Sequence, residues 1–131
     1  MPSGAGFGPA VRAWFNAKVE RLTDEAGEVI VQAGDDVARI TRRHIETRGT
    51  AKSGKQGRIE TGAMLNAVDN EVVKRTQDEV EVRAGYHDAP YYTVFQELGT
   101  SRIEAMYALT DAAEEVLADL PSQIRKAINN V

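Results

Sequence analysis

Residues 70–86, NEVVKRTQDEVEVRAGY, decide the fold class because they hold the clearest strand pattern in the chain. In the second half, apolar and charged residues alternate: Val80, Val82 and Ala84 against Glu79, Glu81 and Arg83. This period of two predicts a strand with one buried and one solvated face. The short polar connection Gln77-Asp78 predicts an antiparallel hairpin with NEVVKRT. Because an isolated hairpin is marginally stable, it must pack on helices or extend a sheet across subunits.

A long helical pattern covers residues 9–48, before the hairpin. Its apolar or small residues recur in steps of three and four: Val11, Phe15, Val19, Leu22, Ala26, Val29, Ala33, Val37, Ile40 and His44. Pro9 suits the first turn of such a helix, and Gly49 suits its end. Gly27 and Gly34 indicate either a close approach of another backbone or a local bend. A helix of roughly 50 Å cannot bury its whole stripe within so small a protein, which favours self-association.

Three shorter helices are expected around and after the hairpin. Residues 61–68 predict a short helix with Thr61 as its N-cap. Asp88 and Pro90 then suit the start of a helix that Gly99 ends. On that helix one apolar face is expected to pack as core: Tyr91, Val94, Phe95 and Leu98. Glu97 lies off this face, where capping or subunit contact suits it better than chemistry.

The final helix is expected to begin at Ser101-Arg-Ile-Glu104, which fits a capping box. Pro121 should kink or restart it. The resulting order is a long N-terminal helix, a short helix, an antiparallel hairpin or small sheet, a short aromatic helix and a C-terminal helix. This is an α+β fold. We expect residues 1–8 to form a flexible arm and residues 9–131 a single domain, with a mobile basic loop at 49–58.

Composition narrows the class of protein. The chain has 131 residues, no cysteine and a formal net charge of −4. Its length suits one domain, and the absence of cysteine excludes disulfides and thiolate chemistry. An acidic balance disfavours a dedicated nucleic-acid binder. No apolar run is long enough to span a bilayer, and no signal-peptide pattern is evident, so synthesis in a cytoplasm is expected.

The positive charge is concentrated in one segment between acidic flanks. Its basic residues are Arg39, Arg42, Arg43, Arg48, Lys52, Lys55 and Arg58. Such segregation suits head-to-tail contact between copies, or docking on an oppositely charged partner, and ordinary solvated faces are the alternative. We take these residues as the candidate partner interface.

No arrangement of residues typical of catalysis is found in the sequence. His44 and His87 are isolated, and no metal-ligand spacing such as HExxH occurs, so His44 is expected to be a packing or interface residue. Glu97 is embedded among aromatics, and if buried it needs a partner or a raised pKa. It lacks an accompanying base, nucleophile or metal. We expect no enzyme activity, no cofactor and no metal.

The order of motifs resembles the siphophage tail-completion, or head–tail joining, family of the gene-product-ten type. R-x-x-T-G-A-x-x-N-A-V at residues 58–68 precedes the hairpin, and an aromatic segment ending in E-x-G-T follows it. The matching positions are Thr61, Gly62, Tyr91, Tyr92, Phe95, Glu97, Gly99 and Thr100. The resemblance covers residues 58–117. The chain departs from the family's proline-aromatic segment further on, because residues 105–112 contain no proline.

This resemblance implies a non-enzymatic virion protein at the phage neck, assembled in the bacterial cytoplasm. It implies a ring of copies, six by family likeness, between a head-side connector or stopper and a tail-side terminator or tube. DNA would pass through the ring without sequence-specific binding, and an acidic lumen would let it slide. Three alternatives remain: a terminator or stopper of the same neck, a nucleic-acid-binding module using residues 39–58, and a small enzyme using Glu97.

Overall fold

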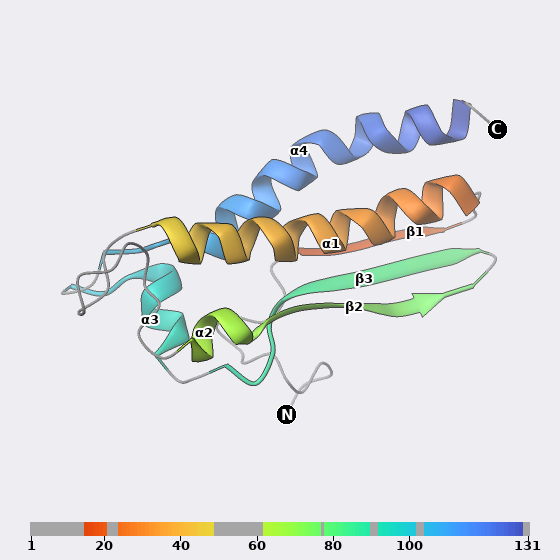
Figure 1. The fold of residues 1–131 in the computed structure, drawn as a ribbon. Coiled ribbons are helices and arrows are strands. Elements are labelled where there is room, and N and C mark those ends of the chain that lie inside the picture. Colours follow the sequence, from red (N-terminus) through yellow and green to blue (C-terminus); the bar gives the residue numbers. More distant parts are fainter. Residues whose placement is uncertain are drawn as a thin grey trace.

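The computed structural model describes residues 15–20, 24–48, 62–76, 78–89, 92–101 and 104–129 (Figure 1). The elements are β1 (Phe15–Glu20), α1 (Asp24–Thr47), α2 (Ala63–Asn66), β2 (Val68–Arg75), β3 (Glu79–Tyr86), α3 (Thr93–Leu98) and α4 (Ala108–Asn129). They form one sheet and two long helices, so the α+β class is confirmed. The arm expected at residues 1–8 and the basic loop at 49–58 lie outside the described residues.

The predicted hairpin is confirmed and forms part of a three-stranded antiparallel sheet, in the order β1-β3-β2. In β3 the alternating residues Val80, Val82 and Ala84 are buried, as their period of two predicts. The register of β2 on β3 shifts between Val72 and Lys74, which marks a bulge in the edge strand β2.

The prediction that the long helix includes residues 15–20 is wrong. Residues 15–20 are strand β1, which pairs with β3 from Phe15 opposite Ala84 to Glu20 opposite Glu79. In FNAKVE, apolar residues alternate with polar ones, so the segment fits a period of two as well as a helical stripe. β3 would otherwise have an open edge, and pairing with β1 satisfies its backbone groups within the same chain. The helix therefore begins at Asp24, where acidic side chains suit its first turn.

Helix α1 lies between the sheet and α4 (Figure 1). It buries residues on more than one face because it has a packing partner on two sides: Ala26, Gly27, Ile30, Ala33, Gly34, Val37, Ala38, Thr41 and Ile45. Most are small or β-branched, which allows both neighbours to approach. The single core of the described residues is built from these positions, the inner face of β3 and the first half of α4. The predicted stripe is thus confirmed from Ala26 onward.

Gly34 lies where α1 packs against β3. A Cβ atom built at Gly34 would lie 3.4 Å from both Cβ and Cγ2 of Val82. The neighbour of Gly34 is therefore a strand side chain and not the other backbone that the sequence suggested. Since α1 runs unbroken from Asp24 to Thr47, the glycine does not end the helix.

This spacing predicts opposite effects for two substitutions of Gly34. Gly34→Ala adds a methyl group at van der Waals distance and gains up to ~1 kcal/mol of helix propensity, so stability should be kept or slightly raised. Gly34→Leu has no space for its further carbons and should destabilise the protein by about 1–3 kcal/mol through overpacking. Urea denaturation of both variants checks this, and equal stabilities would contradict it.

The starts of the other helices differ from expectation. Gly62, with φ of 80°, is the N-cap of α2, while Thr61 lies outside the described residues. Asp88 adopts a left-handed φ of 51° and is not the N-cap of α3, which begins at Thr93 with Tyr92 as N-cap. The capping box at residues 101–104 does not start α4, which begins at Ala108. These cap signals are local, and tertiary contacts override them.

Helix α4 runs through Pro121 to Asn129. The proline therefore does not restart the helix, and Figure 1 shows α4 changing direction along its length. A proline inside a helix removes one backbone hydrogen bond and bends the axis.

Candidate functional site

The face of α3 that packs against the core is opposite to the face that was expected to do so. Phe95 and Leu98 are 42% and 38% exposed, whereas Thr93 and Glu97 are buried. The prediction that the aromatic face of this helix is core is therefore wrong where the structure describes it. Tyr91 lies outside the described residues, and Val94 is half-buried. A helix of six residues contributes little apolar burial, so the polar contact made by Glu97 determines which face is buried.

The carboxylate of Glu97 is fully buried and accepts four hydrogen bonds. Its Oε1 accepts from the Tyr86 hydroxyl at 2.8 Å and from the Leu109 backbone N–H at 3.0 Å. Its Oε2 accepts from the Thr110 backbone N–H at 3.0 Å and from the Thr110 hydroxyl at 2.9 Å. The four donors come from β3 and α4. One side chain of α3 thus ties together three elements.

The Glu97 side chain caps helix α4, although Glu97 itself belongs to α3. Leu109 and Thr110 lie in the first turn of α4, whose N–H groups have no partner within the helix. A carboxylate there satisfies two of them and interacts favourably with the positive end of the helix dipole. The Glu97 backbone adds a further contact, because its carbonyl accepts from the Tyr107 N–H at 3.1 Å. The expected capping role is confirmed. We call these contacts the Glu97 junction.

Tyr86 is the partner that fixes the Glu97 junction to the sheet. Burial raises the pKa of its phenol well above the ordinary value, and the charge of Glu97 and the hydrogen bond to it act in the same direction. The phenol therefore stays protonated and remains a donor far into the alkaline range.

The other motif residues have structural roles or lie on the surface. Gly99 ends α3 with φ of 79°, and its N–H donates to the Phe95 carbonyl at 2.8 Å. The Tyr92 carbonyl accepts from two N–H groups of α3, while Thr100 is exposed. Of the E-x-G-T element, the glutamate and the glycine therefore build the turn that leads to α4.

The arginines at the end of α1 divide into two groups. Arg48 donates from Nη1 to the Met106 carbonyl at 2.7 Å and to Asp111 Oδ2 at 2.6 Å. Arg42 donates to the Val68 carbonyl at 2.8 Å. These two arginines connect α1 to β2 and to the start of α4. Arg39, whose partner is Asp36, and Arg43 are exposed.

The candidate partner interface is therefore reduced. Among its described members, only Arg39 and Arg43 have exposed side chains that make no hydrogen bond or ion pair with a distant part of the described chain. Lys52, Lys55 and Arg58 lie outside the described residues. His44 is half-buried, with Nδ1 3.1 Å from the Ala108 carbonyl, which agrees with its expected packing role.

Sequence reasoning missed Tyr86 and Thr110 as partners of Glu97. Each lies more than ten positions from Glu97 in the chain, and neither spacing is a helical one. The signal available was the buried end of β3, where an aromatic with a hydroxyl follows Gly85. Buried tyrosine hydroxyls need a partner, and Glu97 is the first carboxylate after Asp88 on the C-terminal side of Tyr86.

The Glu97 junction is closed to substrate chemistry. The Glu97 carboxylate already accepts four hydrogen bonds and has no exposed surface. Within the described ranges, no group of three or more His, Asp or Glu residues is placed to hold a metal ion. Among the helices that the structure describes, none is both long and apolar enough to cross a bilayer.

Comparison of the chain with protein-family models, with curated proteins and with solved structures finds no match.

Removing the Glu97 carboxylate should strongly destabilise the protein. Glu97→Ala leaves the donors of Tyr86, Leu109 and Thr110 buried without an acceptor, and each such group costs about 1–3 kcal/mol. We expect a loss of about 3 kcal/mol or more in the free energy of unfolding. Tyr86→Phe removes one donor and should cost less, about 1.5–3 kcal/mol for a bond to a charged acceptor. Chemical denaturation measures both, and an equal or smaller loss for Glu97→Ala would contradict this role.

The raised pKa of Tyr86 predicts a loss of stability in alkali. Below the unfolded pKa of about 10 the phenol is protonated in both states, and its contribution is fully present. Above about pH 10 only the unfolded state releases the proton, so stability falls by up to ~1.4 kcal/mol per pH unit. Wild-type protein should therefore lose more stability between neutral pH and pH about 11 than Tyr86→Phe. Denaturation curves at both pH values test this, and parallel losses would contradict it.

Proposed function

We propose that this protein is a structural subunit of the neck of a long-tailed phage, where it forms a ring that joins the head connector to the tail. The observation that carries the proposal is the order of motifs: T-G before the hairpin, then an aromatic segment with E-x-G-T leading to the last helix. These are Thr61-Gly62 and Tyr91 to Thr100. The ring would assemble in the bacterial cytoplasm and remain in the virion.

The Glu97 junction supports this proposal over an enzymatic one. The one acid that sequence reasoning singled out for chemistry is occupied by hydrogen bonds that hold α3, α4 and β3 together. A rigid joint of this kind suits a subunit that carries load between neighbours. The two hydroxyl groups beside it, those of Tyr86 and Thr110, both donate to its carboxylate.

Exposed apolar side chains also favour an assembly. Phe95, Leu98 and Tyr107 are exposed around α3 and the start of α4. Tyr107 also has a left-handed φ of 51°, which is costly for an aromatic residue and keeps its ring partly in solvent. A surface with several large apolar side chains is typical of contact with other proteins.

The alternative of a nucleic-acid binder is weakened. Two of the four described arginines of the basic segment, Arg42 and Arg48, donate to backbone carbonyls of the same chain. A net charge of −4 also opposes binding to phosphates. Both facts suit DNA that passes through a lumen without being held.

Deleting the gene in its phage tests the proposal. A joining protein should leave DNA-filled heads and separate finished tails, visible by electron microscopy, together with a loss of infectious particles. Complementation with the wild-type gene should restore joined virions. Normal infectious particles from the deletion strain would refute the neck role.

The same experiment separates the related neck functions. A terminator limits the tail tube, so its loss should give tails of uncontrolled length. A stopper closes the filled head, so its loss should give heads that have lost their DNA. Filled heads beside tails of normal length would distinguish joining from both.

A further inference from the structure

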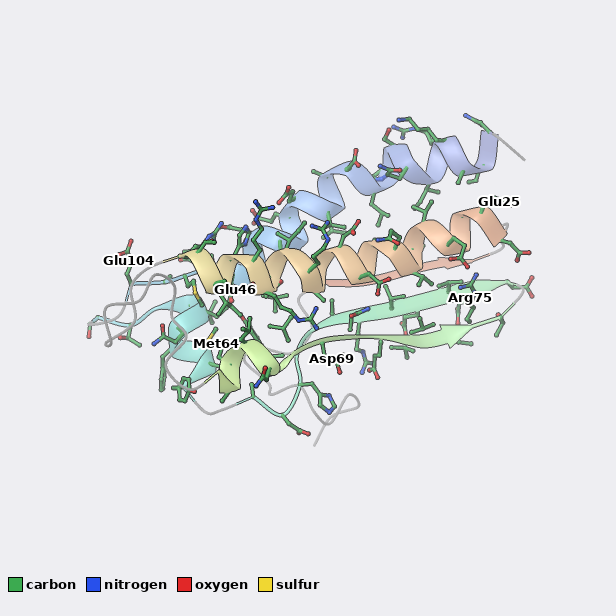
Figure 2. The ribbon with its side chains drawn as sticks, viewed as in Figure 1. Glu25, Glu46, Met64, Asp69, Arg75 and Glu104 are labelled. Carbon is green, nitrogen blue, oxygen red and sulfur yellow. The ribbon has the colours of Figure 1, made fainter. Side chains whose placement is uncertain are left out.

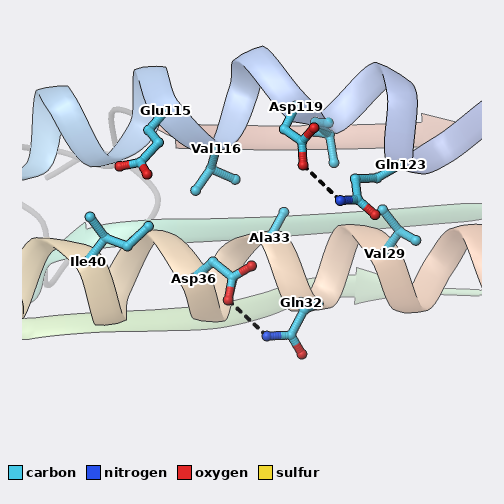
Figure 3. Close-up of a pocket in the computed structure, with 10 residues that line it drawn as sticks. Val29, Gln32, Ala33, Asp36, Ile40, Glu115, Val116, Asp119 and Gln123 are labelled. Carbon is cyan, nitrogen blue, oxygen red and sulfur yellow. Dashed lines mark hydrogen bonds between the residues drawn. The ribbon is translucent and has the colours of Figure 1, made fainter.

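A groove of about 430 Å³ lies between α1 and α4 (Figure 3). Its base is aliphatic: Val29, Ala33, Ile40, Val116 and Leu120. In Figure 3 the Val116 side chain points from α4 toward α1, and Ala33 points from α1 toward α4. On α4 the groove is lined mainly by residues before Pro121, and the small Ala33 faces it from α1. Ala33 and Leu120 are buried at its base, while Val29, Ile40 and Val116 are half-buried and offer apolar surface.

The rim of this groove is acidic. Asp36, Glu115 and Asp119 line it together with Gln32 and Gln123. Asp36 accepts hydrogen bonds from Gln32 and Arg39, and Asp119 accepts one from Gln123. Glu115 makes no ion pair or hydrogen bond with the described part of the chain. The groove thus suits an occupant with apolar side chains followed by positive charge.

The outer half of β2 has this character. Val72 and Val73 are 47% and 39% exposed although they are valines in a strand. The bulge between Val72 and Lys74 leaves Val73 without a partner in β3. Lys74 and Arg75 follow, and their side chains are 56% and 40% exposed. The ion pair of Arg75 with Glu28 is exposed on both sides, so Arg75 can change partners at small cost, whereas Lys74 pairs with the largely buried Glu79. We call Val72–Arg75 the β2 arm.

The β2 arm cannot reach the groove of its own chain. Pairing with β3 fixes the arm in the sheet, and α1 lies between the sheet and α4. Figure 2 shows Arg75 near Glu25, at the start of α1 and on the sheet side of that helix. A second copy of the chain has no such restriction.

We propose that the β2 arm of one copy binds the acidic groove between α1 and α4 of the next copy. Val72 and Val73 cover the aliphatic base, while Lys74 and Arg75 meet Glu115 and Asp119. The two surfaces differ, so the contact is heterologous: repeated, it closes into a ring or extends as a filament. This inference rests on the self-association in the proposed function and adds the surfaces that make it.

Charge reversal tests the contact through the oligomeric state. K74E/R75E and E115K/D119K should each weaken association of the purified protein by roughly tenfold or more in Kd. Combining all four substitutions in one chain restores opposite charges and should bring Kd back close to that of the wild type. D69K, on β2 but outside the arm, is the matched control and should associate like the wild type. Analytical ultracentrifugation measures all four proteins, and thermal unfolding checks that each is folded.

The absence of cysteine allows a second test that also detects weak association. Lys74→Cys and Glu115→Cys proteins, mixed under mild oxidation, should form a disulfide-linked heterodimer. Asp69→Cys mixed with Glu115→Cys gives the background, and Lys74→Cys should exceed it severalfold. Failure of the combined charge variant to regain association, or a Lys74–Glu115 yield at background, would overturn the proposed contact.

The two proposals fail independently. An infectious phage lacking the gene would refute the neck role and leave a measured arm–groove contact standing. A background disulfide yield would overturn the contact and leave the phenotype of the deletion unaffected.

Discussion

The buried carboxylate of Glu97 is the interaction on which the arrangement of the second half of the chain depends. A charge with no exposure is tolerated only where hydrogen bonds replace its hydration, and Glu97 has four such bonds from Tyr86, Leu109 and Thr110. Because the donors belong to β3 and to the first turn of α4, the bonds fix the angle between the sheet and the helix. α3 turns its polar side inward to supply this carboxylate, which leaves Phe95 and Leu98 at the surface.

Helix α1 provides the other constraint, since it must fit both the sheet and α4. Small residues meet this requirement: Gly34 lies against Val82 on one side, and Ala33 faces α4 on the other. At the C-terminal end of α1, Arg48 donates to the Met106 carbonyl and pairs with Asp111. The same region of α4 is thus held by Glu97 from one side and by Arg48 from another. Beyond Pro121 no comparable polar anchor to α1 is seen among the described residues, and the groove lies between α1 and residues 115–123 of α4.

The sequence predicted those parts of the fold that local periodicity determines. The alternation in residues 79–84 identified β3, and the stripe from Ala26 onward identified α1. Prediction from local pattern failed where a segment fits both the helical and the strand period. FNAKVE is such a segment, and it forms a strand because β3 would otherwise have an unpaired edge. Prediction from local pattern failed again at α3, where four apolar residues predicted a buried face. A single hydrogen-bonded carboxylate outweighed them, and its partners are too far away in sequence for any spacing rule to find. The capping role of Glu97 could nevertheless be predicted, because an isolated acidic residue near a helix end commonly acts as a cap.

The E-x-G-T element therefore has an architectural explanation of its own. Glu97 caps α4, and Gly99 adopts the left-handed φ that lets the chain turn from α3 toward that cap. Any chain that joins a hairpin to a final helix in this way needs an acceptor and a flexible residue at these positions. The element thus stabilises the framework formed by α3, the turn and α4, and its hydrogen bonds are directed inward. In the proposed assembly, recognition of neighbours would come from the outward surfaces: the apolar side chains around α3, the β2 arm and the acidic groove. The Glu97 junction is not part of these surfaces, so contacts there could change while the junction stays intact.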